Sequence, residues 1–407
     1  MAASRDSFRF LVLSRGLRSV AIIYMTLAAP LYLDFIKISL PQIGLIYVAV
    51  MLFAGALNMA LGMLGDRQGY KKALLLAEIL PMLAAFTIGF TENTALLIAA
   101  VILGGVGGVA GGIRGTFTPG TTALVASSYP DDKERVKRLS SLTKIGSIAS
   151  ILGALMLIGH TYLASMFGIA GAYRILFAVA GAVMALSFGS LLLVQSDKRP
   201  KKTTTMMKRS SLIYTLKVSG ANMINGAAIG ISMPLFPLIL GMAFHIPIEL
   251  LSLTVGLVYI PSYVGVAFGS YLAGRYSGRH NIVKVASYAR MSSGILLLGM
   301  GAVISVAYLG FGSSLYLLAL ITLIYLVRSI IAGFGNPSVN AVNIKGIHGE
   351  DYGTAASIQG VAMSASMASS GFSGFLIEDL LPSPLFIGGV MQIVSGMVYL
   401  GFFRKRD

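Results

Sequence analysis

The chain has 407 residues, of which 56% are hydrophobic and 11% are charged, and its formal net charge is +16 at pH 7. This apolar content, with a mean hydropathy of +0.82, is more than one soluble core can bury and excludes an ordinary soluble protein. The basic residues are scattered over separate short loops, which argues against nucleic-acid binding, and the absence of cysteine excludes disulfides and thiol chemistry.

Apolar stretches of ~20 or more residues follow one another along the chain, and each is long enough to cross a hydrocarbon layer of roughly 30 Å as a helix. We therefore predict an all-α integral membrane protein with twelve transmembrane helices. The predicted spans are about 10–33, 41–65, 73–91, 95–125, 139–161, 172–195, 212–241, 250–273, 282–308, 315–344, 354–377 and 384–403.

The orientation follows from the loops that carry positive charge. Most of the 31 Lys and Arg residues lie before the first span, after an even-numbered span or after the last one. The opposite set of loops holds Lys37 and Arg174. By the positive-inside rule we expect both termini to be cytoplasmic and the protein to lie in the plasma membrane. The first apolar run continues through Pro30 and Tyr32 as a first helix would, so we expect it to be retained rather than removed as a signal peptide.

The chain divides near its middle. Residues 196–210 are polar and strongly basic, and they separate two sets of six predicted spans. We expect an N-terminal six-helix bundle at 1–195, a cytoplasmic linker at 196–210 and a C-terminal bundle at 211–407. The two halves look like weak repeats, in which Arg67 aligns with Arg275.

The loop after the second span carries the most specific motif. It reads Gly62-x-Leu64-x-Asp66-Arg67-x-Gly69-x-Lys71-Lys72. This motif resembles the signature loop between helices two and three of the major facilitator superfamily of secondary transporters. The resemblance implies two pseudo-symmetric six-helix bundles and rocker-switch alternating access. It also implies a gating role, without substrate contact, for Gly62, Asp66, Arg67, Gly69, Lys71, Lys72 and Arg275. For Lys71 and Lys72, a role in fixing topology alone is an equal alternative.

The fourth span carries a second resemblance. The stretch from Gly111 through Arg114 to Pro119 is similar to the fourth helix of many drug and metabolite exporters of this superfamily. No phosphate-binding loop, nucleophile elbow or zinc-binding helix motif occurs in the sequence. We therefore expect a monomeric transporter that is not an enzyme and that uses neither a cofactor nor a metal.

Charged residues inside the spans are few and unbalanced. The basic residues at membrane depth are Arg18, Arg114, Lys144, Arg290 and Arg328, whereas Glu78 is the one acid. Each such charge costs on the order of 2.5 to 3.5 kcal/mol near a helix centre, so each needs a partner or a wet cavity. Glu78, Lys144 and Arg18 are candidates for ion coupling or for a buried charge pair. A structural pairing of Glu78 with Arg114 or Lys144 stays open.

The resemblance implies that helices one, four, seven and ten line the substrate cavity. This places Arg18, Arg114 and Arg328 on cavity helices, with Arg328 near the midplane. Arg328 and Arg114 are candidates for substrate contact, and the alternative for Arg328 is capping carbonyl groups or binding water. The neutral candidates are Tyr24, Asn222, Asn225, Tyr259, Tyr263 and Gln359. For each of these residues, interhelical hydrogen bonding is the alternative role.

A cavity with surplus positive charge should attract anions, because Arg binds a carboxylate or phosphate through two parallel hydrogen bonds. The leading hypothesis is thus a transporter for a small organic anion or an amphipathic acidic metabolite. A proton-coupled exporter of drugs or other lipophilic compounds, with Glu78 as the titrating group, is the main alternative. A transporter-like sensor or scaffold is a third. The expected partners are a small-molecule substrate, membrane lipids, and protons or another coupling ion.

Overall fold

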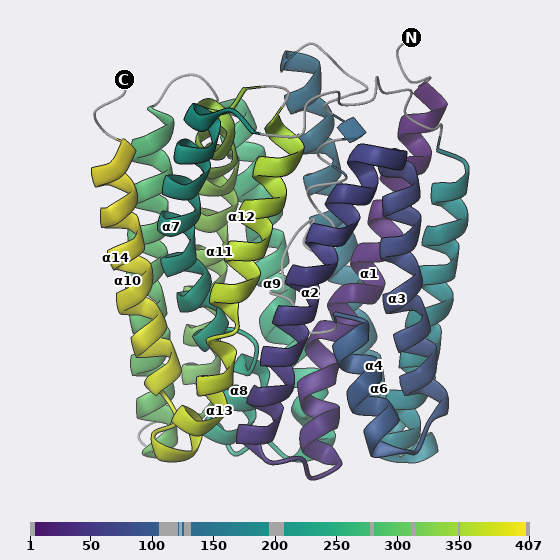
Figure 1. Cartoon of the computed structure of the whole chain (residues 1–407). Helices are drawn as coiled ribbons and strands as arrows, with labels where there is room; N and C mark the ends of the chain where they lie inside the picture. The colour runs from purple at the N-terminus through teal and green to yellow at the C-terminus, as the bar shows by residue number, and fades with distance from the viewer. Residues whose placement is uncertain are drawn as a thin grey trace.

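The computed structural model describes residues 5–105, 121, 124–125, 132–194, 207–276, 281–310, 314–348 and 351–403. Within these residues every regular element is a helix, which confirms the all-α prediction. The long helices stand side by side along one common direction, and α1 (Arg5–Phe35) begins at the end of the bundle where α14 (Ser383–Phe403) finishes (Figure 1).

The first half of the chain contains five labelled helices. They are α1, α2 (Leu40–Gln68), α3 (Tyr70–Phe90), α4 (Thr94–Leu103) and α6 (Asp132–Leu192). The helix α4 is the start of the predicted fourth span, and most of the remainder of that span lies outside the described residues. The 61 residues of α6 cover the predicted fifth and sixth spans. These two helices meet at Gly168, whose φ of 73° and ψ of 163° are not helical.

The second half contains the remaining helices. They are α7 (Arg209–Ser232), α8 (Phe236–Ala243), α9 (Ile248–Arg275), α10 (Ile282–Tyr308), α11 (Ser314–Lys345), α12 (Tyr352–Met367), α13 (Ser370–Asp379) and α14. Two predicted spans are not continuous. Span seven breaks between α7 and α8 at Pro234, which has no N–H to donate, and span eleven breaks at Ala368 and Ser369. Broken helices of this kind are tolerated in membranes where neighbouring helices satisfy the freed backbone groups.

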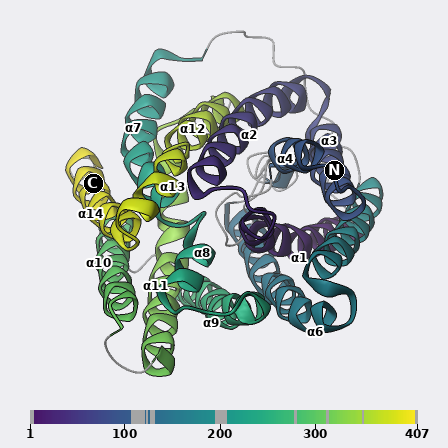
Figure 2. The same ribbon diagram turned by 90° about the horizontal axis from the view of Figure 1, so that it is seen from below.

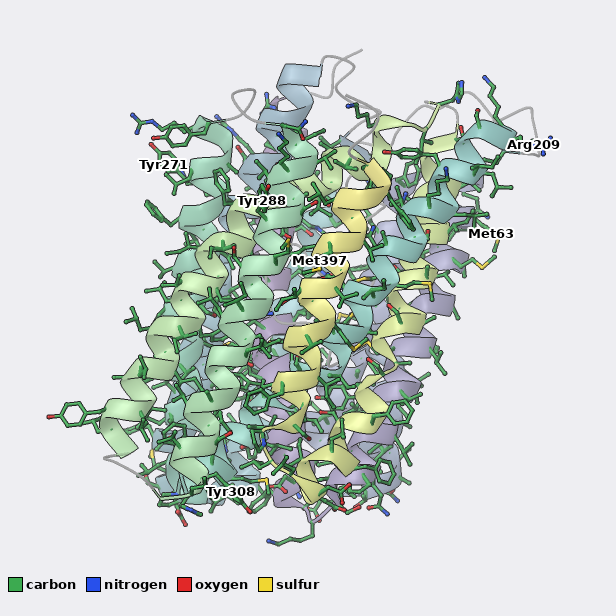
Figure 3. The ribbon with its side chains drawn as sticks, turned by 90° about the vertical axis from the view of Figure 1, so that its left-hand side faces the viewer. Met63, Arg209, Tyr271, Tyr288, Tyr308 and Met397 are labelled. Carbon is green, nitrogen blue, oxygen red and sulfur yellow. The ribbon has the colours of Figure 1, made fainter. Side chains whose placement is uncertain are left out.

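The surface of the bundle is apolar. In the described part of the chain, ten helical stretches are long and apolar enough to cross a membrane, and one of them is the double span of α6, so the twelve predicted spans are consistent with the structure. Large aliphatic side chains face outward, as Leu186 does with 62% of its surface exposed. Figure 3 shows Tyr271 and Tyr288 toward one end of the bundle and Tyr308 at the other, where aromatic rings meet the lipid headgroups.

The two halves of the chain lie side by side, with α1–α6 on one side of the end-on view and α7–α14 on the other (Figure 2). Across this boundary α2 packs against α12 and α13, while α6 packs against α9. The contacts are close because Gly44 and Gly374 bring backbones together: a Cβ on Gly374 would collide with the carbonyl group of Leu40. The Tyr173 hydroxyl lies 3.2 Å from Ser252 Oγ, which adds a hydrogen bond between α6 and α9.

Candidate functional site

A buried charge cluster links α1 and α3. Arg15 Nη2 donates to Glu78 Oε1 at 2.7 Å, and Arg18 Nη1 donates to Glu78 Oε2 at 2.8 Å. The Glu78 side chain is fully buried, and the two arginine side chains are 6% and 7% exposed. Both carboxylate oxygens are thus occupied by guanidinium groups. Lys144, one of the two partners that the sequence left open for Glu78, is not among these contacts.

The reason for this difference is the rotation of each helix about its own axis. Lys144 is exposed on α6 and has no recorded contact with Glu78, although the two residues are predicted to lie at similar depth. Arg114 lies outside the described residues. Arg15 lies one turn before Arg18 and reaches the same carboxylate from the same face of α1.

A second buried guanidinium belongs to Arg290 on α10. Its Nη2 donates to Asn222 Oδ1 at 2.5 Å, its Nη1 donates to Ser395 Oγ at 3.3 Å, and its Cζ lies 4.3 Å from the centre of the Tyr399 ring. Two neutral hydrogen-bond acceptors and one aromatic face therefore stabilise this charge. In this arrangement Asn222, a substrate candidate from the sequence, acts as a partner for Arg290.

The amide of Asn343, near the end of α11, connects the Arg290 cluster to two further helices. Asn222 Nδ2 donates to Asn343 Oδ1 at 3.1 Å, and Tyr399 donates to the same oxygen at 3.4 Å. Gln359 on α12 donates to the Asn343 backbone carbonyl at 3.1 Å. Gln359 and Asn222 thus make interhelical hydrogen bonds, which were the predicted alternative to substrate contact.

A third buried guanidinium, on Arg328 of α11, has weaker partners. Its Nη2 donates to Gln392 Oε1 at 3.4 Å and its Nη1 lies 3.7 Å from Met233 Sδ. The Nε atom is buried without a hydrogen-bond partner. Gln392 in turn donates to Asn225 Oδ1 at 3.2 Å. Asn225, a substrate candidate from the sequence, is therefore connected to Arg328 through Gln392. Among the described residues no carboxylate pairs with Arg328.

Aromatic rings pack beside this arginine. Tyr325 lies one turn before Arg328 on α11, and its ring meets the ring of Tyr259 edge-on with the centroids 5.3 Å apart. Phe236 on α8 contacts both rings, at 5.6 and 6.1 Å. Tyr263 lies 6.1 Å from Tyr259, and its hydroxyl is buried without a partner. The structure therefore brings Tyr259, Tyr263 and Arg328 into one neighbourhood, as candidate residues that share a substrate site would require.

Tyr24 belongs to a different cluster. It is fully buried in α1, its hydroxyl donates to the Tyr173 carbonyl at 3.5 Å, and its ring meets Phe177 edge-on at 5.3 Å. These contacts join α1 to α6 and leave Tyr24 separate from Arg328. The sequence analysis missed Gln392, Met233 and Tyr325. Gln392 had a usable signal, because it is a lone amide within an apolar helix.

The loop motif lies between α2 and α3. Gly69 adopts a φ of 97°, a conformation that favours glycine, and it ends α2 and precedes α3. Gly62 faces Ser357 of α12 so closely that a side chain would collide. The side chains of Asp66 and Arg67 are outside the described set. Lys72 is exposed, and so is Arg275 in the last turn of α9.

Lys71 differs from Lys72 in that its side chain makes a hydrogen bond to α6. Its Nζ donates to the carbonyl of Leu192, the last residue of α6, at 2.7 Å. A cation there satisfies an unpaired carbonyl and complements the helix dipole. We expect Lys71→Ala to lower the free energy of unfolding by about 0.5–1 kcal/mol, and Lys72→Ala to lower it less. Thermal denaturation followed by circular dichroism measures both, and equal effects would contradict the assignment.

A groove on the outside of the bundle is chemically unlike the Arg328 site. It has a volume of about 380 Å³ and is lined by Leu257, Val258 and Pro261 of α9 and by six residues of α11. Its one polar side chain, Thr322, donates its hydroxyl to the Leu318 carbonyl at 2.7 Å. The groove offers no charge or free hydrogen-bonding group to a substrate, so the candidate site is built around Arg328.

Long apolar helices with buried, hydrogen-bonded cations define a polytopic membrane transport protein. Residues 11–403 match the Major Facilitator Superfamily, and the chain belongs to that family. It is therefore a transmembrane transporter of the inner or plasma membrane, and the resemblance seen in the loop motif is confirmed. Members of this family bind small-molecule substrates.

Two curated relatives match parts of the chain. Methyl viologen resistance protein SmvA of Salmonella typhimurium is 30% identical over 110 residues, which are 26% of this chain and 21% of that protein. Multidrug resistance protein MdtG of a Rahnella species is 27% identical over 176 residues, which are 43% of this chain and 39% of that protein. The matches thus span well under half the length of these relatives.

Two solved structures share the fold over nearly the whole chain. The nucleoside transporter NupG covers 98% of this chain and all of its own, with a TM-score of 0.69 at 12% identity. A structure from a study of proton dependent oligopeptide transporters covers 98% of both chains, with a TM-score of 0.71 at 13% identity. At such identities the likeness concerns the fold alone.

Proposed function

We propose that this transporter carries a small organic anion or an amphipathic acidic metabolite by rocker-switch alternating access, with Arg328 as the residue that binds the anionic group. The single observation that carries the proposal is the state of Arg328. Its side chain is buried in the middle of α11, and no carboxylate among the described residues neutralises it. Buried charges in membrane helices mark substrate or ion pathways.

The other buried arginines of the described helices have stronger partners. Arg15 and Arg18 share the Glu78 carboxylate at 2.7 and 2.8 Å, and Arg290 has an amide oxygen at 2.5 Å and a tyrosine face. Arg328 has an amide oxygen at 3.4 Å and a thioether sulfur at 3.7 Å. A guanidinium with such long contacts gains most from an added carboxylate, which accepts two charge-assisted hydrogen bonds.

Arg328→Gln is expected to reduce the uptake of organic anions into reconstituted vesicles at least 10-fold, which corresponds to the loss of roughly 1.4 kcal/mol of binding. The amide fills part of the same volume but carries no charge. Arg174→Gln is the control, because Arg174 lies near the Gly168 break of α6, is 31% exposed and is paired with Glu92. The proposal fails if the protein carries cations or neutral solutes and Arg328→Gln leaves their uptake unchanged.

A proton-coupled exporter of drugs or other lipophilic compounds is the second candidate. The observation in its favour is that both curated relatives are named for resistance to such compounds. The double pairing of Glu78 counts against it, because protonation of Glu78 would leave two buried guanidiniums beside a neutral acid. If wild-type vesicles move a cationic dye against an imposed pH gradient and do not take up organic anions, the exporter replaces the anion transporter.

The placement in the membrane completes the proposal. The proposed halves are 1–195 and 211–407, joined by a cytoplasmic linker at 196–210, and both termini are cytoplasmic. The basic loops support this orientation, since the positive-inside rule places them in the cytoplasm. The loop residues Gly62 to Lys72 and Arg275 would then lie at the cytoplasmic face and bias the equilibrium between the two open states. The contact of Gly62 with Ser357 supports such a role, because it joins α2 to α12 across the boundary between the halves.

A further inference from the structure

The cluster around Arg328 contains more hydrogen-bond donors than acceptors. Arg328 Nε and the Tyr263 hydroxyl are both buried and have no partner, and the bond from Nη2 to Gln392 is long at 3.4 Å. A buried donor without an acceptor is costly in a native structure and calls for an explanation. A bound carboxylate would provide the missing acceptors, because each of its oxygens accepts more than one hydrogen bond.

The charge of the cluster limits the ligand to a monoanion. Arg328 carries one positive charge, and its other neighbours among the described residues are neutral: Gln392, Met233, Tyr325 and Tyr259. A single carboxylate balances that charge. A phosphate dianion would leave one negative charge buried without a partner, which is strongly unfavourable.

The rest of the cluster is aromatic. Tyr325 and Tyr259 are near enough to Arg328 to interact with its charge, and the rings of Phe236 and Tyr263 pack against these two tyrosines. All the recorded ring pairs are edge-on or tilted, with centroids 5.3 to 6.1 Å apart. These are the arrangements in which a further planar ring finds favourable edge and face contacts.

An aromatic cluster in the other half of the chain lacks this combination. There Tyr24 donates to a carbonyl group, the Tyr173 hydroxyl bonds to Ser252, and the rings pack with Tyr32 and Phe177. Arg174 contacts Tyr32 there, but it is paired with the Glu92 carboxylate. Aromatic rings beside an arginine that has no carboxylate partner and an unpaired Nε thus occur together only in the Arg328 cluster among the described residues.

We propose that the site at Arg328 takes aromatic carboxylates, with the carboxylate on Arg328 and Tyr263 and the ring against Tyr325, Tyr259 and Phe236. This inference rests on the proposed function, since it names the substrate class of the same site. Favourable ring contacts are expected to make benzoate bind about 10-fold more tightly than cyclohexanecarboxylate, which has the same charge and nearly the same size but a puckered ring without a π system. Benzyl alcohol, which has the ring without the charge, should not bind measurably.

The test is isothermal titration calorimetry on the purified full-length protein in detergent with benzoate, cyclohexanecarboxylate and benzyl alcohol. Tyr263→Phe removes only a buried hydroxyl that has no partner, so its unfolding midpoint should stay at or above that of the wild type while benzoate affinity falls several-fold. Tyr47→Phe is the matched control. Tyr47 is also fully buried with an unpaired hydroxyl, but it lies on α2, and its loss should change neither quantity.

The outcomes separate this inference from the proposed function. Equal affinity for benzoate and cyclohexanecarboxylate, with both abolished by Arg328→Gln, would overturn the aromatic selectivity and leave the anion transporter standing. Unchanged benzoate affinity in Tyr263→Phe would overturn the assignment of that hydroxyl to the carboxylate. Absence of binding for every organic acid, together with uptake of cations, would remove both proposals.

Discussion

Glu78→Gln is expected to be the most destabilising single substitution among the buried polar residues described above. It removes the carboxylate that both Arg15 and Arg18 use, and it leaves two guanidiniums close together in a buried site. Breaking a buried ion pair by removing one partner costs about 3–5 kcal/mol. The measurement is the midpoint of thermal unfolding in detergent, followed by circular dichroism because the chain has no Trp.

The chain offers a matched control for this experiment. Glu92 is also paired with an arginine, Arg174, but the two side chains are 78% and 31% exposed. Glu92→Gln should therefore change the free energy of unfolding by less than about 1 kcal/mol. Adding Arg15→Gln to Glu78→Gln should restore part of the stability, because one buried guanidinium remains beside the neutral amide instead of two. Equal midpoints for Glu78→Gln and Glu92→Gln would contradict the account.

The same geometry bears on coupling. If Glu78 took up a proton during transport, its neighbours would be left in nearly the state that Glu78→Gln creates. The protein would meet that cost in every cycle. Asp34, another acid of α1, lies at the far end of that helix beside Lys37. This argues for a mechanical role of Glu78, in which it holds α1 and α3 together while the halves move.

Composition was sufficient to predict the all-α membrane fold, because the fold class depends on the hydropathy of whole segments. The family was predicted from the resemblance of the loop motif from Gly62 to Lys72. The depth of charged residues was also predictable, since it follows from their distance to the end of a span. Which charged residues contact one another was not predictable. Depth says nothing about the rotation of a helix about its axis, so the sequence left Lys144 open as a partner for Glu78 and did not name Arg15, which binds it.

The breaks within helices were a second limit. Pro234 and Pro261 both lie in apolar segments, yet span seven breaks at Pro234 while α9 continues through Pro261. A proline removes one backbone hydrogen bond in each case, and the packing of neighbouring helices decides whether the helix ends. The break at Pro234 matters for function, because it places Met233 beside Arg328 and Phe236 beside Tyr325.

Gly374→Leu is expected to hold the halves apart at the end of the bundle away from the termini, the proposed outer face, and so to reduce transport at least 10-fold. In the structure Gly374 lies directly against the Leu40 carbonyl and Pro41, and Gly44 faces the Gly371 carbonyl in return. These backbone atoms cannot move aside as the end of a flexible side chain can. The leucine therefore fits only if α13 moves away from α2, which shifts the population toward the state open at that face.

The absence of cysteine makes this shift directly measurable. Ser370 is fully buried beside Gly44, and its hydroxyl has no partner, so Ser370→Cys changes the contact little. A membrane-impermeant thiol reagent should label this cysteine slowly in the parent and at least 10-fold faster in the Gly374→Leu background. Gly220→Leu is the control, because a side chain at Gly220 meets nothing within 4 Å. If both leucine variants were labelled at the parent rate, the contact of α2 with α13 would not be a gate, and the glycines there would serve packing alone.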